Sequence, residues 1–160
     1  MAASKSDWGK PLPEGRGLGI AFYFCHAAHV AEVADVSVEK DGKLKVHKVV
    51  AAVDVGPIIN MSGAINQVQG SIIDGFSTMM GQKITMENGL IQQTNLDTYP
   101  VLRISDAPEV DVHFIQSDHA PTGLGEPALP PLAPAVANAI FAASGRRVKK
   151  MPLIELGYRT

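Results

Sequence analysis

The sequence contains one cysteine, Cys25, and no long uninterrupted apolar run. A single cysteine excludes an internal disulfide framework, and it excludes a cysteine-ligated iron–sulfur cluster or zinc ribbon within this chain. Without a long apolar run, no segment is expected to span a membrane as a helix. The net charge is only −2, and the one basic cluster is short, at residues 146–150. There is therefore no electrostatic case for a nucleic-acid partner.

The composition is that of an ordinary globular chain, with 46% hydrophobic and 19% charged residues among 160. This balance supports a core and fits a single domain. Residues 1–19 are polar and rich in glycine and proline, so we expect them to form a lead-in segment without regular structure. Gly15, Gly17 and Gly19 do not fit a dinucleotide-binding fingerprint, because they precede an apolar strand instead of following one.

The order of predicted elements indicates an α+β fold built from antiparallel hairpins and two main helices. Alternating residues predict one long strand over 20–39, bent near Ala27 and Ala28, which pairs through a turn with a return strand over 44–55. Two further β elements follow. They are a second hairpin around Asn88 and Gly89 and a last strand over residues 109–116.

Two amphipathic or apolar stretches predict the main helices. The first runs over 63–80, with Asn60 or Ser62 as its N-terminal cap. The second ends at Ser144, with Gly145 as its C-terminal cap. Its residues are apolar almost all round, so it should be buried on several sides.

One face of the predicted helix at 63–80 is polar and contains glycine. The residues that gather there are Gln67, Gly70, Ser71, Asp74 and Thr78, and an interior glycine costs about 1 kcal/mol relative to alanine. We therefore expect another group to approach this face closely. A solvated face that tolerates its glycines is the alternative.

A stiff acidic loop precedes the second helix. Gly123 and Gly125 permit a positive φ or a close approach, whereas the ring of Pro127 fixes its own φ directly after Glu126. A rigid loop that presents one carboxylate suits catalysis, because catalytic groups must be held tightly in place. On spacing alone, the simpler interpretation is a surface glutamate ahead of a helix N-terminus, where negative charge is favourable.

Two other groups of reactive residues carry little weight. Cys25, His26 and His29 could suggest a metal site, but residues four apart on a strand are separated by roughly 13 Å. The run Ser117-Asp118-His119 contains the residue types of a catalytic triad, yet adjacent residues cannot adopt its geometry.

Several motifs together resemble the molybdenum hydroxylases of the xanthine dehydrogenase and aldehyde oxidase superfamily. Residues 123–153 are similar to the C-terminal signature of that family, and most similar to its isoquinoline 1-oxidoreductase β-subunit and membrane-linked aldehyde dehydrogenase branch. Further similarity lies in AVDVG at 52–56, QVQG at 67–70 and QTNLDTYPVLR at 93–103. The resemblance covers about residues 8–153.

The resemblance implies oxidative hydroxylation of an aldehyde or N-heteroaromatic substrate with water. It implies that Glu126 is the catalytic base, which takes a proton from the water-derived nucleophile. Gln67, Gly70 and Gly125 would bind the cofactor, a molybdopterin with molybdenum in its cytosine dinucleotide form. Iron–sulfur clusters would lie on a partner subunit or domain, and no protein ligand to a metal is implied in this chain.

The family's large subunit is several times longer, so the resemblance implies a C-terminal part of it. Residues 1–19 would form an entry segment, residues 20–153 would form part of the molybdopterin-binding domain, and residues 154–160 would be a tail. The expected partners are the remainder of the large subunit, an iron–sulfur small subunit and a small-molecule substrate. Alone, the chain should be inactive and hold molybdenum weakly. Bacterial cytoplasm and periplasm both remain open.

Three positions depart from the family pattern: Met61, Gln69 and Leu96, of which Leu96 could alter the substrate pocket. A non-catalytic function is the alternative hypothesis. The apolar helix in so short a chain would then belong to an assembly or dimerisation module, in which exposed apolar surfaces pair with a partner or with a second copy.

Overall fold

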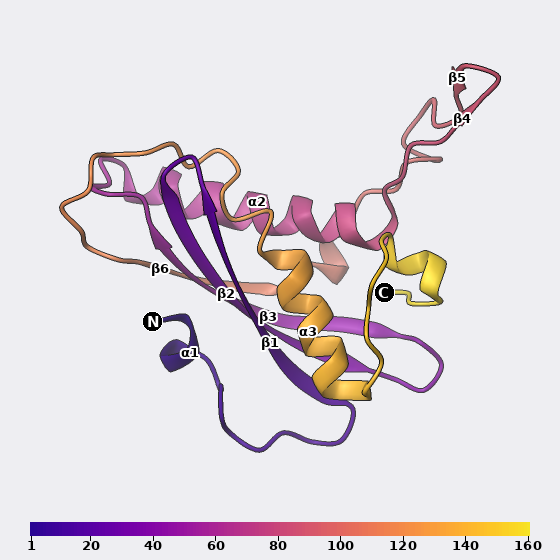
Figure 1. The fold of residues 1–160 in the computed structure, drawn as a ribbon, viewed down its shortest axis with the longest axis horizontal. Coiled ribbons are helices and arrows are strands. Elements are labelled where there is room, and N and C mark those ends of the chain that lie inside the picture. The colour runs from indigo at the N-terminus through magenta and orange to yellow at the C-terminus, as the bar shows by residue number, and fades with distance from the viewer.

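The computed structural model describes residues 1–160, which form a four-stranded sheet with helices on its faces (Figure 1). The strands lie in the order β1-β2-β3-β6. Neighbours among the first three are antiparallel, whereas β6 is parallel to β3. Their bounds are Arg16–Cys25 for β1, Ala28–Val38 for β2, Leu44–Asp54 for β3 and Glu109–Phe114 for β6. The predicted α+β class is confirmed, with one parallel pairing that was not predicted.

Two long helices share one core with the sheet. Helix α3 crosses the face of β1 and β2, and α2 passes across the N-terminal end of α3 (Figure 1). The short helix α1 packs on the opposite face, where Ala2 contacts Val33 and Ala52. No helix combines the length and apolar character needed to cross a membrane. The remaining bounds are Ala2–Lys5 for α1, Met61–Gly81 for α2, Leu132–Ser144 for α3, Met86–Glu87 for β4, Leu90–Ile91 for β5, Ile104–Asp106 for η1 and Leu153–Leu156 for η2.

The predicted caps at Asn60 and Gly145 and the second hairpin are confirmed. Asn60 caps α2, because its side chain accepts a hydrogen bond of 3.0 Å from the N–H of Gly63. Gly145 ends α3 in the left-handed conformation, at φ 72°. The hairpin of β4 and β5 turns at Asn88 and Gly89, which both have positive φ, and it projects away from the body (Figure 1).

The single bent strand expected over residues 20–39 is wrong. The chain reverses at His26 and Ala27, whose φ angles of 50° and 63° form a two-residue turn, and β1 pairs along its whole length with β2. A turn with positive φ at two central residues usually contains asparagine or glycine. His26 and Ala27 lack that sequence signal, so the reversal resembled an irregularity within one strand.

Both ends of the chain contain more structure than the sequence suggested. Residues 1–19 include α1 and the start of β1, so the expectation of a lead-in segment without an element is wrong. Residues 154–160, expected to form a tail, are packed against the body. Tyr158 is 2% exposed within the core, and Arg159 forms a β-bridge with Lys43. Paired backbone and a buried aromatic ring hold these ends, and neither is visible in local composition.

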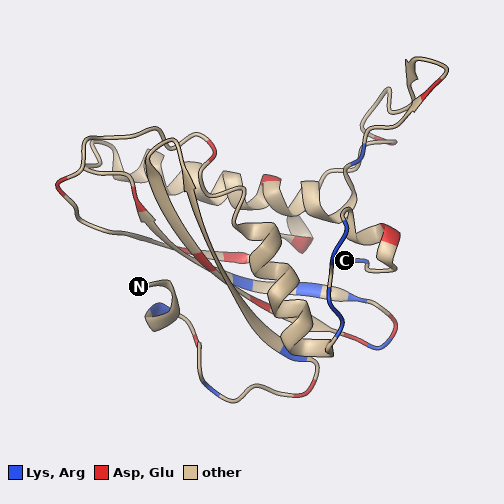
Figure 2. Ribbon diagram, viewed as in Figure 1, with Lys and Arg blue, Asp and Glu red and all other residues tan.

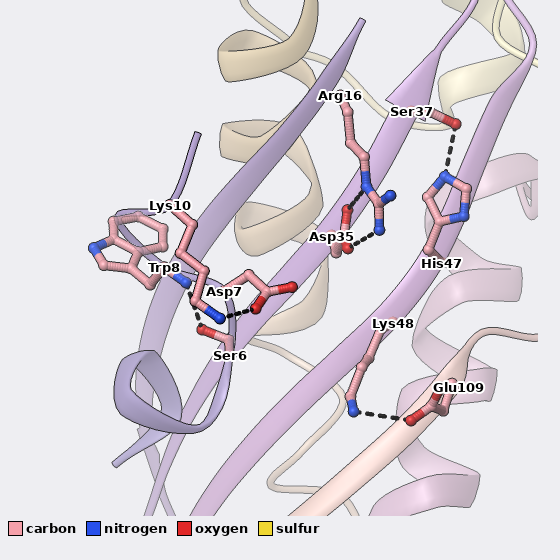
Figure 3. Close-up of polar contacts among 10 residues, drawn as sticks. All are labelled: Ser6, Asp7, Trp8, Lys10, Arg16, Asp35, Ser37, His47, Lys48 and Glu109. Atoms are coloured by element: carbon pink, nitrogen blue, oxygen red, sulfur yellow. Dashed lines mark hydrogen bonds and ion pairs between the residues drawn. The ribbon is translucent and has the colours of Figure 1, made fainter. Parts of the chain in front are cut away.

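Part of the sheet face opposite α3 carries polar pairs (Figure 3). The Arg16 guanidinium donates to both carboxylate oxygens of Asp35, over 2.8 and 2.6 Å. This bidentate bond raises the pKa of Arg16 above its ordinary value. Lys48 lies 2.9 Å from Glu109 and 3.3 Å from Asp111, both on β6, so two ion pairs link the parallel strand to β3.

The basic cluster after α3 folds back along the molecule (Figure 2). Arg147 stacks over the ring of Phe141, with 3.6 Å from its guanidinium carbon to the ring centroid. Lys150 pairs with Glu155 over 2.7 Å, and Lys83 pairs with the same carboxylate. Hydrogen bonds from these two lysines lower the pKa of Glu155 to about 2. The cluster therefore contacts the C-terminal segment.

A carboxylic acid lies unpaired in the core. Glu32 on β2 is fully buried, opposite Ala21 of β1 and Ala51 of β3. Neither of its side-chain oxygens has a hydrogen-bond partner. Burial raises its pKa well above the ordinary value, because the low-dielectric core disfavours the charged form.

Replacing Glu32 with leucine should make the chain more stable, and increasingly so as pH rises. In the folded state Glu32 retains a proton that an unfolded glutamate loses near pH 4.3. Above that pH unfolding therefore releases a proton, and the free energy of unfolding of the wild type falls as pH rises. The fall is up to about 1.4 kcal/mol per pH unit until the folded pKa is passed. Urea unfolding at pH 5 to 8 checks this, with exposed Glu14→Gln as control. Equal slopes for wild type and Glu32→Leu would contradict the prediction.

Candidate functional site

The structure brings the four predicted site residues together in one hollow of about 320 Å³. Gln67 and Gly70 come from α2, and Gly125 and Glu126 come from the loop that leads to α3. These two segments lie far apart along the chain, so their proximity is a result of the fold. The rest of the lining comprises Ser71, Asp74 and Leu129.

Side chains of α2 hold the acidic loop by its carbonyl groups. The Gln67 amide donates to the Leu124 oxygen over 3.4 Å, and the Ser71 hydroxyl donates to the Gly125 oxygen over 3.1 Å. Successive tethers on one helix face fix the loop backbone immediately before Glu126. Ser71 belongs to the polar face seen in the sequence, although no specific contact could be assigned to it there.

The two interior glycines of α2 have different surroundings. A Cβ at Gly75 would lie 3.1 Å from the Leu129 oxygen, so this glycine permits close approach of the loop. A Cβ at Gly70 would meet nothing within 4 Å. Close approach to the helix therefore occurs within the chain at Gly75, whereas the space over Gly70 is open to another molecule.

Glu126 is exposed and faces a histidine. Two-thirds of its side chain is accessible, and its Oε1 lies 3.2 Å from Nε2 of His26 in the β1–β2 turn. The sequence did not predict this contact, because His26 was considered only as a possible metal ligand. If a turn had been predicted at His26 and Ala27, the imidazole would have been expected beside this loop and not along a strand.

The loop also offers unused hydrogen-bond donors. The N–H groups of Gly123, Leu124, Gly125 and Glu126 donate to no other backbone group. A Cβ at Gly123 or Gly125 would meet nothing within 4 Å. The arrangement thus combines a proton-accepting carboxylate with free N–H donors and open space, which suits an oxygen-rich ligand.

The chain before this loop is fixed to the end of β3. Thr122 donates its N–H to the Val55 oxygen over 3.0 Å, and Gly56, at φ 74°, lies so close that a Cβ would be 2.6 Å from the His119 oxygen. The Ser117 hydroxyl donates to Asp54 over 2.5 Å, and this bond holds the pKa of Asp54 below its usual range. Ser117 and His119 both face Asp54 and do not form a triad with Asp118.

Comparison with solved structures identifies the fold. The fold resembles quinoline 2-oxidoreductase from Pseudomonas putida 86, with TM-score 0.71 and 20% identity over 79% of this chain and 17% of that one. It also resembles the aldehyde oxidoreductase from Desulfovibrio desulfuricans, with TM-score 0.70 and 23% identity over 78% of this chain and 14% of that one. The chain therefore has the fold of one segment of much larger oxidoreductases.

Sequence comparison identifies the family. Residues 3–108 match the model of the molybdopterin cofactor-binding domain, and this chain belongs to that family. A membrane-bound aldehyde dehydrogenase of Gluconacetobacter polyoxogenes, named for pyrroloquinoline quinone, is 36% identical over 93% of this chain and 20% of its own length. Isoquinoline 1-oxidoreductase subunit beta of Brevundimonas diminuta is 32% identical over 94% of this chain and 20% of its own length. The predicted superfamily and branch are confirmed.

The extent of these matches matters for the site. The chain spans about one fifth of the length of the relatives that it matches. Gln67 and Gly70 lie within the region that matches the family model, whereas Gly125 and Glu126 lie beyond it, in the part covered by the pairwise relatives. The roles of all four residues remain predictions.

Proposed function

We propose that this chain is the segment of a molybdenum hydroxylase that carries the catalytic base and faces the cofactor. The complete enzyme would oxidatively hydroxylate an aldehyde or N-heteroaromatic substrate with water. The observation that carries the proposal is that Glu126 and Gln67 converge on one open hollow in a chain of the molybdopterin-binding family. The names of two relatives, an aldehyde dehydrogenase and an isoquinoline oxidoreductase, favour these substrate classes.

The residues around the hollow fit a molybdopterin. Gly70, Gly123 and Gly125 leave room for close approach, and the loop N–H groups can donate to its oxygen atoms. When bound, this cofactor supplies the two-electron redox centre of the reaction. We propose the cytosine dinucleotide form, with iron–sulfur clusters on a separate small subunit.

The chain's own contribution is positioning and proton transfer. Gln67 and Ser71 fix the loop, so the Glu126 carboxylate is held at the edge of the hollow, where it can accept a proton from the attacking water. His26, at 3.2 Å, then offers a route for that proton toward solvent. The remainder of the large subunit would enclose the hollow and exclude water, which strengthens these electrostatic interactions.

A series of substitutions at Gly70 tests the cofactor-facing surface. Gly70→Ala should stabilise the chain by up to about 1 kcal/mol, since the new methyl group meets nothing and alanine favours the helix. Gly70→Leu and Gly70→Phe should keep that fold but lower the molybdopterin content of the assembled enzyme, because they fill the hollow. Urea unfolding and cofactor analysis of the same proteins measure the two effects.

The controls separate fold from cofactor. Thr78, also exposed on α2 but absent from the hollow, should tolerate Thr78→Leu with normal cofactor content. Normal molybdopterin content in Gly70→Phe would contradict the proposal. Recovery of pyrroloquinoline quinone instead of molybdopterin would contradict the choice of cofactor.

An assembly function is a second candidate, favoured by the exposed face of β1. This edge strand presents Ile20, Phe22 and Phe24 to solvent on the face opposite α3, an apolar patch of the kind that pairs with another surface. In the main proposal the remainder of the large subunit covers it. In the alternative, a second copy covers it, and light scattering would detect a dimer that Phe22→Lys dissociates.

A further inference from the structure

Three side chains that the proposed function does not use converge where β2 and β3 meet the loop that follows β6. They are His29, Asp54 and His119, and their nearest ligand atoms all lie within 4.8 Å of one another. We propose that these three residues bind one divalent transition-metal ion of the zinc type. Imidazole nitrogen and carboxylate oxygen are the donors that Zn²⁺ commonly accepts.

Strand register and loop anchoring place the three residues. His29 lies directly opposite Asp54 in the pairing of β2 with β3. His119 arrives from the connection to the acidic loop, and its backbone is packed against Gly56. Because that connection is also hydrogen-bonded to Val55 at Thr122, the third ligand is held near the first two.

The donor atoms of this cluster are incompletely used. Nδ1 of His29 is buried and has no hydrogen-bond partner, which is costly for a polar atom unless a ligand is bound. Asp54 accepts from Ser117 and Gly56 on Oδ1, and its Oδ2 lies 3.4 Å from Nδ1 of His119. Two ligands of a tetrahedral zinc ion lie roughly 3.3 Å apart, so this pair is already spaced for binding.

The surroundings resemble an exchangeable site. Ser117 orients the carboxylate from outside, as partners of metal ligands generally do. The ring of Phe24 lies 4.9 Å from that of His29 and forms an apolar wall. The His119 side chain is 61% exposed, so solvent can reach a fourth position. Three protein ligands and one open position favour an ion that exchanges with solution.

The spacing that argues against a metal site at Cys25, His26 and His29 does not apply to this cluster. Those three residues follow one another along a single hairpin. In the structure, His26 turns toward Glu126, whereas His29 meets donors from β3 and from a loop much later in the sequence. The two sets of contacts share only the β1–β2 hairpin.

Calorimetric titration of the 160-residue chain with ZnCl₂, in metal-free buffer, tests the proposal. We expect one ion per chain, and Co²⁺ in its place should give the visible absorption of a four-coordinate ion. His29→Ala and His119→Ala should each weaken binding at least tenfold. His47→Ala is the matched control, because His47 pairs only with Ser37 and should bind as wild type does.

Two further variants make the outcome decisive. His119 is exposed on a loop, so His119→Ala should fold normally by circular dichroism even if His29→Ala does not. His26→Ala tests whether the ion instead lies between His26 and Glu126. No binding by the wild type, binding that survives His119→Ala, or binding lost in His26→Ala but kept in His119→Ala would each overturn the proposal.

Discussion

Replacing Glu126 with glutamine should reduce turnover of the assembled enzyme by about 10²- to 10⁴-fold, the usual contribution of a general base. Glutamine has nearly the same shape but cannot accept the proton. The loop should remain in place, since its tethers from Gln67 and Ser71 bind backbone oxygens and do not involve the Glu126 side chain. Molybdenum content should therefore stay near that of wild type. Steady-state kinetics normalised to bound molybdenum measure the loss.

Asp74 provides a matched control for this substitution. It lines the same hollow from α2 and makes no ion pair or hydrogen bond through its side chain with the rest of the chain. Asp74→Asn removes one negative charge at the same place, so it should change turnover by far less than Glu126→Gln. Equal losses in both variants would mean that local charge, and not proton transfer, explains the effect. Full activity in Glu126→Gln would contradict its assignment as the base.

Sequence predicted the parts of the fold that have strong local signals. The caps of α2 and α3, at Asn60 and Gly145, have side-chain or backbone preferences that act within one turn. The same holds for the Asn88–Gly89 turn. The β1–β2 turn lacked such a signal, and the parallel pairing of β6 with β3 depends on long-range contacts. Local reasoning could find neither.

The candidate site divides in the same way. Glycine and proline around Glu126, and the polar helix face that holds Gln67 and Gly70, single these residues out locally, but the roles expected for them come from the family resemblance. His26 was missed, since its contact with Glu126 requires the reversal at Ala27 and the docking of two distant segments. His29, Asp54 and His119 were likewise invisible as a group, because strand register and the packing at Gly56 bring them together.

Close packing of β1 on α3 explains a glycine pattern that the sequence left without a function. A Cβ at Gly17 would lie 2.5 Å from the N–H nitrogen of Ala143 and 2.6 Å from the Ala139 oxygen. A Cβ at Gly19 would be still closer to the backbone of Ala135 and Ala139. The missing side chains let the strand lie directly on the helix backbone. Gly17 and Gly19 thus serve packing instead of binding a nucleotide.

Gly19→Ala should consequently destabilise the chain by more than about 3 kcal/mol, the upper end for overpacking, because the obstacle is helix backbone that cannot rotate away. Typical domains have only about 5–15 kcal/mol of stability, so Gly19→Val should prevent α3 from docking. Gly123→Ala, where a methyl group meets nothing, is the matched control and should change stability little. Urea unfolding of the three variants measures this. Since α3 begins soon after Glu126, the docking of α3 on β1 also supports the acidic loop. A Gly19→Ala variant as stable as Gly123→Ala would contradict that support.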